Sequence, residues 1–110
     1  MGVTLFENSP VYPIIFWVSD FSKDYVLTKP IHDSQKRVNE KKALSLREQY
    51  PSLNNGIFLQ IDCRDNYELI RELSSFGKDL IVLSPSVIQD KVWNRINSMN
   101  EEYIKIRSSK

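Results

Sequence analysis

The chain has 110 residues, of which 41% are hydrophobic and 26% are charged, with 15 Lys and Arg against 14 Asp and Glu. That length fits one domain with a modest core, and the composition excludes a disordered or fibrous chain. No apolar run approaches the roughly 20 residues of a membrane helix, and we find no signal peptide. The single cysteine, Cys63, excludes an intrachain disulfide. We therefore expect a cytoplasmic protein without a membrane partner.

The charges are unevenly distributed along the chain. Residues 29–50 carry six basic and three acidic side chains, residues 51–90 three basic and six acidic, and residues 91–110 five basic and two acidic. This pattern fits solvated faces, or alternatively a patch that binds an anionic ligand or backbone phosphates. The basic residues of the first segment that would form such a patch are Lys36, Arg37, Lys41, Lys42 and Arg47.

The first half of the chain predicts two strands and two short helices. Residues 11–18 are rich in β-branched and aromatic side chains and predict a strand, with Pro13 at its start or on an edge. Asp20 or Ser22 caps a short helix that runs to about residue 28, before Pro30. Residues 31–40 are polar and predict an exposed strand. Good helix formers predict a short helix over residues 41–50, inserted in a connection.

The second half begins with a turn at residues 54–56 and a buried strand over 57–63. Asp65 followed by Glu68 fits a capping box for a helix that ends near Gly77. A short apolar strand follows over 80–83. Ser84 is the expected cap of the last helix and Pro85 its first residue. That helix carries an apolar stripe at helical spacing: Ile88, Val92, Ile96, Met99, Tyr103 and Ile106.

The order of these elements predicts an α+β fold of the ferredoxin-like βαββαβ type. It has an antiparallel four-stranded sheet, two helices on one face and an additional C-terminal helix. We expect an N-terminal remnant or linker over residues 1–10, the ferredoxin-like domain over 11–106 and a basic tail over 107–110. The fold serves enzymes, sensors and RNA-binding modules, so it names no function by itself.

The residue types that carry catalysis or hold cofactors are scarce. In a strand, His32 and Ser34 would lie roughly 6–7 Å apart, too far for a direct hydrogen bond between nucleophile and base. Cys63 is expected to be a small buried side chain rather than a partner of His32. One His and one Cys do not make a zinc site, and three glycines do not make a phosphate-binding loop. We therefore predict no enzyme activity, no metal and no cofactor.

RNA recognition is an alternative on this fold, because some ferredoxin-like sheets stack bases on aromatic side chains of their central strands. Phe16, Trp17 and Phe58 lie on predicted strands. The basic, glycine and aromatic pattern of such a surface is missing from residues 57–63. We therefore interpret these aromatic residues as core.

Three phrases together carry a family resemblance. They are Lys-Pro-Ile-His-Asp-Ser-Gln at 29–35, a helix ending in Ser-Ser-Phe-Gly at 74–77, and Leu-Ile-Val-Leu-Ser-Pro at 80–85 before an amphipathic helix. Read in this order, the chain resembles the C-terminal extension, or WCX domain, of WYL-domain transcriptional regulators over about residues 11–104. It departs from that pattern in the longer stretch at 39–55 and in lacking the WYL signature and the helix-turn-helix. It therefore looks like a fragment of a longer regulator, although a short separate protein is the alternative.

The resemblance implies a sensory role without catalysis. Such domains are thought to contribute to sensing an effector, here a nucleotide or single-stranded nucleic acid, and to dimerisation. The implied partners are the WYL and helix-turn-helix domains of the same regulator and a second copy of the chain. Guanidinium groups can fork onto phosphates, and His and Gln can donate and accept hydrogen bonds. The candidate ligand-binding residues are His32, Ser34, Gln35, Lys36, Arg37, Arg71 and Ser75, with Phe76 and Gly77 in the same motif.

Each candidate also has a structural interpretation. His32 fixes the start of a strand through its neighbours, Gly77 ends a helix, and Arg71 pairs with Glu68, Glu72 or Asp24. At the level of the domain, one rival is a pure dimerisation or protein-interaction module that uses the last helix around Trp93. The other is a small enzyme of the acylphosphatase type. No Arg follows the first strand to cradle a phosphate, so we do not favour the enzyme.

Overall fold

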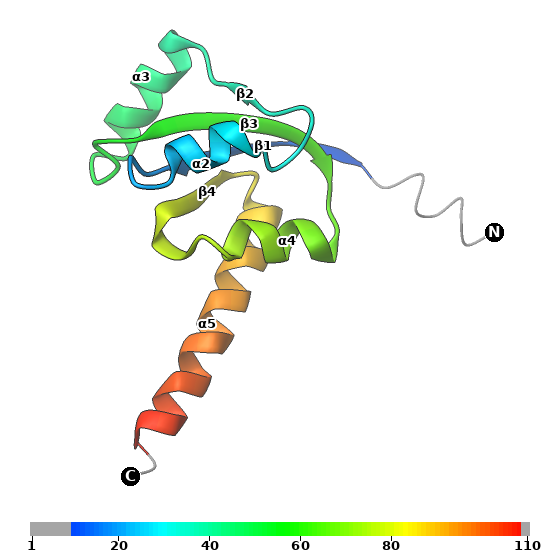
Figure 1. The fold of residues 1–110 in the computed structure, drawn as a ribbon, viewed down its shortest axis with the longest axis vertical. Helices are drawn as coiled ribbons and strands as arrows, with labels where there is room; N and C mark the ends of the chain where they lie inside the picture. Colours follow the sequence, from blue (N-terminus) through cyan, green and yellow to red (C-terminus); the bar gives the residue numbers. More distant parts are fainter. Residues whose placement is uncertain (1–9, 109–110) are drawn as a thin grey trace, which may run out of the picture.

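The computed structural model describes residues 10–108; residues 1–9 of the predicted linker and 109–110 of the predicted tail lie outside them. Strands and helices alternate in the predicted order (Figure 1). The elements are β1 (Val11–Val18), α2 (Lys23–Thr28), β2 (Lys36–Arg37), α3 (Glu40–Gln49), β3 (Ile57–Arg64), α4 (Tyr67–Ser74), the 3-10 helix η1 (Gly77–Asp79), β4 (Leu80–Ser84) and α5 (Ser86–Ser108).

The four strands form one antiparallel sheet in the order β2-β3-β1-β4. This is the strand order of the ferredoxin-like fold, which confirms the predicted class. The inner strand β1 pairs with β3 along its whole length, but with β4 only from Ile15 onward. Pro13 therefore lies where one side of β1 has no neighbouring strand, which is how an inner strand accommodates a residue without an N–H.

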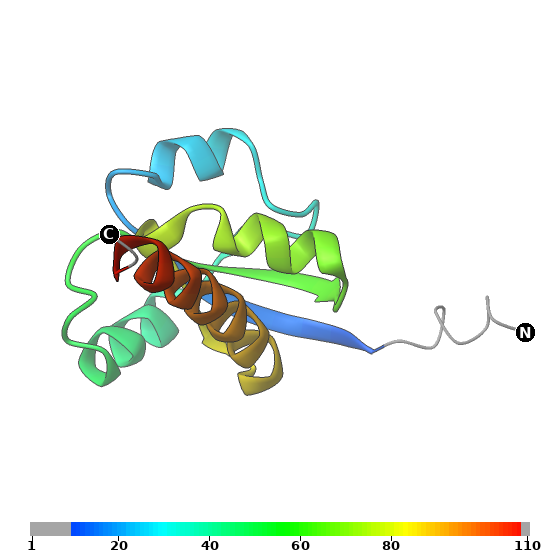
Figure 2. The same ribbon diagram turned by 90° about the horizontal axis from the view of Figure 1, so that it is seen from below.

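One face of the sheet carries the main core. The buried side chains of Phe16 and Ile61 and their neighbours on this face pack against α2, α4 and the first turns of α5. Figure 2 shows helices α2 and α4 on the same side of the sheet, as predicted. The three helices contribute Val26 from α2, Leu69, Ile70 and Leu73 from α4, and Ile88 and Val92 from α5.

Helix α3 covers part of the opposite face, where Leu46 packs on Ile15, Trp17 and Phe58. The predicted helix over 41–50 is thus confirmed, and it has a packing role. Trp17 and Phe58 are 8% and 3% exposed, and Phe16 is fully buried on the other side. The interpretation of these rings as core is confirmed. A base-stacking surface on the central strands is therefore excluded.

The structure corrects several predicted element boundaries, beginning with those of β2 and α4. The strand predicted over 31–40 shrinks to the two residues of β2. Helix α4 begins after Asn66, whose side-chain oxygen accepts the Leu69 N–H at 2.8 Å, and not after Asp65. Asp65 instead pairs with Lys91 of α5. The two residues before α4 are both good caps locally, so the local sequence does not distinguish between them.

Helix α5 begins one residue later than predicted and runs two residues beyond the predicted domain boundary. The Pro85 carbonyl accepts the Gln89 N–H at 3.0 Å, so Pro85 precedes the helix instead of being its first residue. Only Ile88 and Val92 of the apolar stripe are buried, and the later turns project away from the sheet (Figure 1). Within residues 10–108, neither α5 nor any other helix is long and apolar enough to span a membrane.

Candidate functional site

The phrase at residues 30–35 forms a tight turn before β2. The Gln35 N–H donates to the His32 carbonyl at 3.0 Å and closes it. His32 Nδ1 lies 2.7 Å from Ser34 Oγ and 3.1 Å from the Ser34 backbone nitrogen. The expectation that these two side chains lie too far apart was wrong, because it assumed a strand where the chain turns.

Gln35 ties this turn to α2. Its Oε1 accepts the Ile31 N–H at 2.9 Å, and its Nε2 donates to the Val26 carbonyl at 3.1 Å. Together with the contacts of Ser34 and His32, these bonds give all three side chains a structural function. Their predicted role in ligand binding stays a prediction.

His32 also borders a recess of about 240 Å³ with Cys63, Glu68 and Glu72. The two carboxylates make this recess unsuited to an anion. Burial raises the pKa of the Cys63 thiol, which keeps it protonated and makes it a poor nucleophile. Among the described residues, no group of three or more His, Cys, Asp and Glu side chains is placed to hold a metal ion.

Lys36 and Arg37 lie on β2, at the edge of the sheet. Lys36 is opposite Gln60 and Arg37 is opposite Leu59, so their side chains start on opposite faces. Both border a recess of about 640 Å³ on the α3 side, together with Lys42. Arg47 does not join this group, because its guanidinium donates to the Gly56 carbonyl at 2.7 Å.

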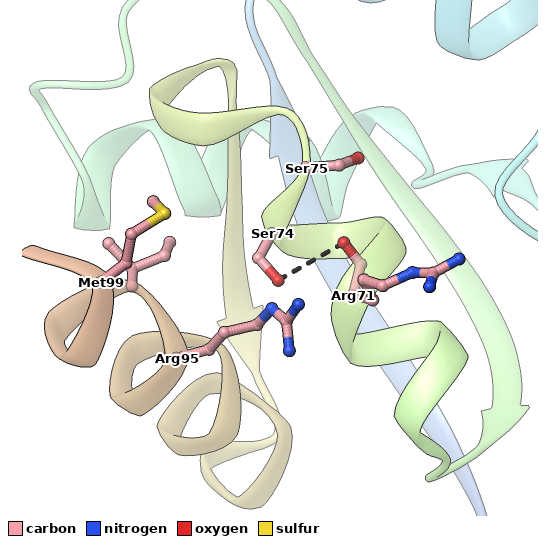
Figure 3. Close-up of a pocket in the computed structure, with 6 residues that line it drawn as sticks. Arg71, Ser74, Ser75, Arg95 and Met99 are labelled. Atoms are coloured by element: carbon pink, nitrogen blue, oxygen red, sulfur yellow. Dashed lines mark hydrogen bonds between the residues drawn. The ribbon is translucent and has the colours of Figure 1, made fainter. Parts of the chain in front are cut away.

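Arg71 and Ser75 lie elsewhere, in a pocket of about 440 Å³ between α4 and α5 (Figure 3). We call this the α4–α5 pocket. In the part of the chain that the structure describes, the guanidinium of Arg71 forms no ion pair, so the predicted pairing with an acid is not found. The structure thus separates the predicted site residues into three places. The pocket is lined by Arg71, Ser74 and Ser75 near the end of α4 and by Arg95, Ile96 and Met99 of α5.

The positive charge of the pocket comes from its two arginines. Both serine hydroxyls donate to carbonyls of their own helix, Ser74 to Ile70 and Ser75 to Glu72. Arg95 forms no ion pair with any described residue either. Two arginines without an ion pair among the described residues therefore line the pocket from α4 and from α5, and this charge favours binding of an anion there.

Sequence reasoning missed Arg95 and its neighbour Tyr67. The Arg95 guanidinium lies over the Tyr67 ring, 5.3 Å from its centroid, and Nη1 is 3.5 Å from the hydroxyl oxygen. This cation lowers the pKa of Tyr67. Helical spacing places Arg95 beside the apolar stripe, four residues after Lys91 and four before Met99. This spacing indicates a pocket residue only once α4 is known to pack alongside α5.

The family described as WCX domain matches residues 14–99. The chain belongs to the WCX domain family. The matched range covers most of the chain and includes every residue that lines the α4–α5 pocket. The search of curated proteins finds no match.

The structure shows what each of the three sequence phrases forms in this domain. Within this WCX domain, the first forms the turn held by Ser34, the second forms α4 and one wall of the pocket, and the third forms β4 and leads into α5. The family points to a regulatory domain of WYL-type regulators and is not a known enzyme family.

Proposed function

We propose that this WCX domain is a non-catalytic regulatory module that contributes to sensing a phosphate-bearing effector, a nucleotide or single-stranded nucleic acid, in a WYL-type transcriptional regulator. The observation that carries the proposal is that Arg71 and Arg95, neither of which forms an ion pair among the described residues, both line the α4–α5 pocket. A guanidinium matches a phosphate by two parallel hydrogen bonds, and two of them neutralise most of its charge.

In this proposal the effector acts through the two helices that line the pocket. Its walls are two separate helices, so a ligand that bridges Arg71 and Arg95 favours the conformation in which α4 and α5 are held together. A ligand that binds one conformation of a protein more tightly than another shifts the protein toward the first conformation. The partners in this scheme are the WYL and helix-turn-helix domains and a second copy of the chain, in the cytoplasm.

The test is a fluorescence-anisotropy titration of the chain with labelled single-stranded DNA at low and moderate salt. We expect Arg71→Ala and Arg95→Ala each to weaken binding by about tenfold, since a hydrogen bond to a charged group contributes about 1.5–3 kcal/mol. Added salt should weaken binding further. The Lys36→Ala/Arg37→Ala variant is the matched control, because it removes positive charge at the β2 edge.

The outcomes separate the two basic regions. Loss of affinity in the control, with the pocket variants unchanged, would move the site to the recess beside β2. Absence of saturable binding at low salt would reject the proposal for this domain.

A dimerisation module without a ligand of its own is the second candidate. It is favoured by the projecting part of α5, where Met99 is 55% and Tyr103 58% exposed on the stripe that is buried further back. Sedimentation equilibrium should show a dimer that Tyr103→Glu dissociates and Ser98→Glu, off the stripe, leaves intact. A monomeric chain at high concentration would reject this candidate.

A further inference from the structure

A second recess lies beside the α4–α5 pocket, nearer the start of both helices. It measures about 390 Å³ and is lined by Asp65, Asn66, Tyr67, Ile70 and Lys91. Arg95 contacts Tyr67, so this pair of side chains connects the two spaces. We call this space the Tyr67 recess.

The two spaces differ in charge. In the Tyr67 recess Lys91 pairs with Asp65, so its positive charge is already neutralised by a carboxylate. A phosphate placed there would meet Asp65, whereas an uncharged ring would not. Arg71 and Arg95, which form no ion pair among the described residues, line the neighbouring pocket. The α4–α5 pocket therefore offers a place for an anion, and the neighbouring Tyr67 recess offers one for a neutral group.

Tyr67 provides a surface for such a group. Its side chain is 66% exposed, and the only ring contact found for it among the described residues is Arg95 on one face. A nucleobase stacks well on an exposed aromatic ring, and a guanidinium next to the ring strengthens such a stack. Trp93 is also exposed, but it lies in an apolar recess beside β4 that no cation lines.

We propose that Tyr67 is the specificity-determining residue of this site: the unpaired nucleobase of the ligand stacks on Tyr67 while its phosphate binds Arg71 and Arg95. The ligand class is a phosphate that carries an unstacked base, a chemistry shared by a free nucleotide and a single strand. This inference rests on the proposed function, since it needs the phosphate to occupy the α4–α5 pocket.

The experiment compares two labelled probes, a short oligothymidylate and an abasic deoxyribose-phosphate strand of equal length. Tyr67→Leu should weaken binding of the oligothymidylate by about tenfold, because the base loses the aromatic ring on which it stacks. Tyr67→Phe, which keeps the ring, should bind within about twofold of the wild type. Neither substitution should change binding of the abasic strand. Tyr67 is exposed, and circular dichroism confirms that each variant is folded.

The result pattern distinguishes failure of this inference from failure of the proposed function. If Arg71→Ala weakens both probes while Tyr67→Leu weakens neither, the phosphate site stands and stacking is wrong. If Tyr67→Leu weakens both probes equally, Tyr67 only positions Arg95, and stacking is again wrong. If neither probe binds the wild type, both proposals fail.

Two further arms identify the source of the base. Thymidine monophosphate and deoxyribose 5-phosphate are added as competitors of the bound oligothymidylate. Competition by the nucleotide but not by the sugar phosphate supports a free nucleotide as ligand, and competition by neither supports a strand. Equal competition by both would overturn the role of the base. A 5-bromouracil strand should also crosslink to Tyr67 on irradiation, and a crosslink elsewhere would count against the proposed stack.

Discussion

The Ser34 hydroxyl holds both backbone groups of Asp62: it accepts the Asp62 N–H at 2.7 Å and donates to the Asp62 carbonyl at 3.1 Å. The ladder of β2 pairs Lys36 with Gln60 and Arg37 with Leu59. Continued by two residues, the same register would place Ser34 opposite Asp62. A side chain thus replaces the backbone pairing at the point where the chain leaves the sheet to turn through His32.

Replacing Ser34 with Ala should therefore destabilise the domain. The Asp62 N–H and carbonyl would lose their partner in a partly buried position, which costs about 1–3 kcal/mol. Urea denaturation should show a lower midpoint with an unchanged slope. Ser45→Ala, on the exposed side of α3, is the control and should stay within about 0.5 kcal/mol of the wild type.

The same variant separates the two interpretations of the Pro-Ile-His-Asp-Ser-Gln phrase. We expect single-stranded DNA to bind Ser34→Ala as it binds the wild type at a temperature where both are folded. Unchanged stability together with weakened binding would assign Ser34 to the ligand instead.

The start of α4 provides a second prediction. Asn66→Ala removes the side-chain oxygen that caps the Leu69 N–H and should cost about 1 kcal/mol. Asp65→Ala removes only a partly exposed pair with Lys91, and such pairs contribute about 0–1 kcal/mol. Chemical denaturation of the two variants side by side measures the difference. A larger loss in Asp65→Ala would contradict the assignment of Asn66 as the cap.

These two regions show where reasoning from sequence succeeds and where it stops. The type and order of the main elements follow from local patterns, because apolar spacing and turn residues act over a few positions. Asp65 and Asn66 are equally good caps locally, and in the structure Asn66 caps the Leu69 N–H while Asp65 pairs with the distant Lys91. Likewise, the polar residues 31–35 look extended until Ser34 is seen to bond with Asp62, 28 positions away.

The candidate site was predicted only in part for the same reason. Arg71 and Ser75 were found because they lie in a recognisable phrase. Their separation from Lys36 and Arg37 depends on which face of the sheet each element covers. Arg95 belongs to no phrase, and it becomes a candidate only because α5 packs against α4.

Two glycines with positive φ should respond differently to substitution by Ala. Gly56 has a φ of 75°, and a Cβ there would lie 2.0 Å from the Val18 carbonyl oxygen. Gly77 has a φ of 60°, and its Cβ would meet no atom within 4 Å. Gly77→Ala should cost about 1–2 kcal/mol for the left-handed backbone alone. Gly56→Ala adds a backbone clash, and we expect about 2–5 kcal/mol.

Thermal unfolding followed by circular dichroism would rank these variants. The Gly56 loop also carries the bond from the Gly56 N–H to Asp20 at 3.1 Å and the bond from Arg47, so any shift of the loop loses more than the clash itself. Equal melting temperatures for the two variants would contradict the close approach of Gly56 to β1.

The contact between Arg95 and Tyr67 makes the phenol sensitive to pH. The nearby guanidinium stabilises the phenolate, so the pKa of Tyr67 lies below the ordinary tyrosine value near 10. The difference between the alkaline absorbance titrations of the wild type and Tyr67→Phe isolates this group. Its midpoint should move up in Arg95→Gln, which removes the charge and keeps a donor. A midpoint unchanged by Arg95→Gln would show that the two side chains are not in contact in solution.

The lowered pKa of Tyr67 in the folded state also determines how the stability of the domain changes with pH. A phenol that ionises more easily in the folded state adds stability above the pKa it has in the unfolded chain. That contribution is lost as the pH falls through the folded-state pKa, so none is expected at neutral pH.

The phenolate of Tyr67 that forms at high pH also places a negative charge beside the α4–α5 pocket. Affinity for single-stranded DNA should therefore decline as the pH rises through the Tyr67 midpoint, and Tyr67→Phe should lack that decline. Identical pH profiles for the two proteins would remove Tyr67 from the neighbourhood of the bound phosphate.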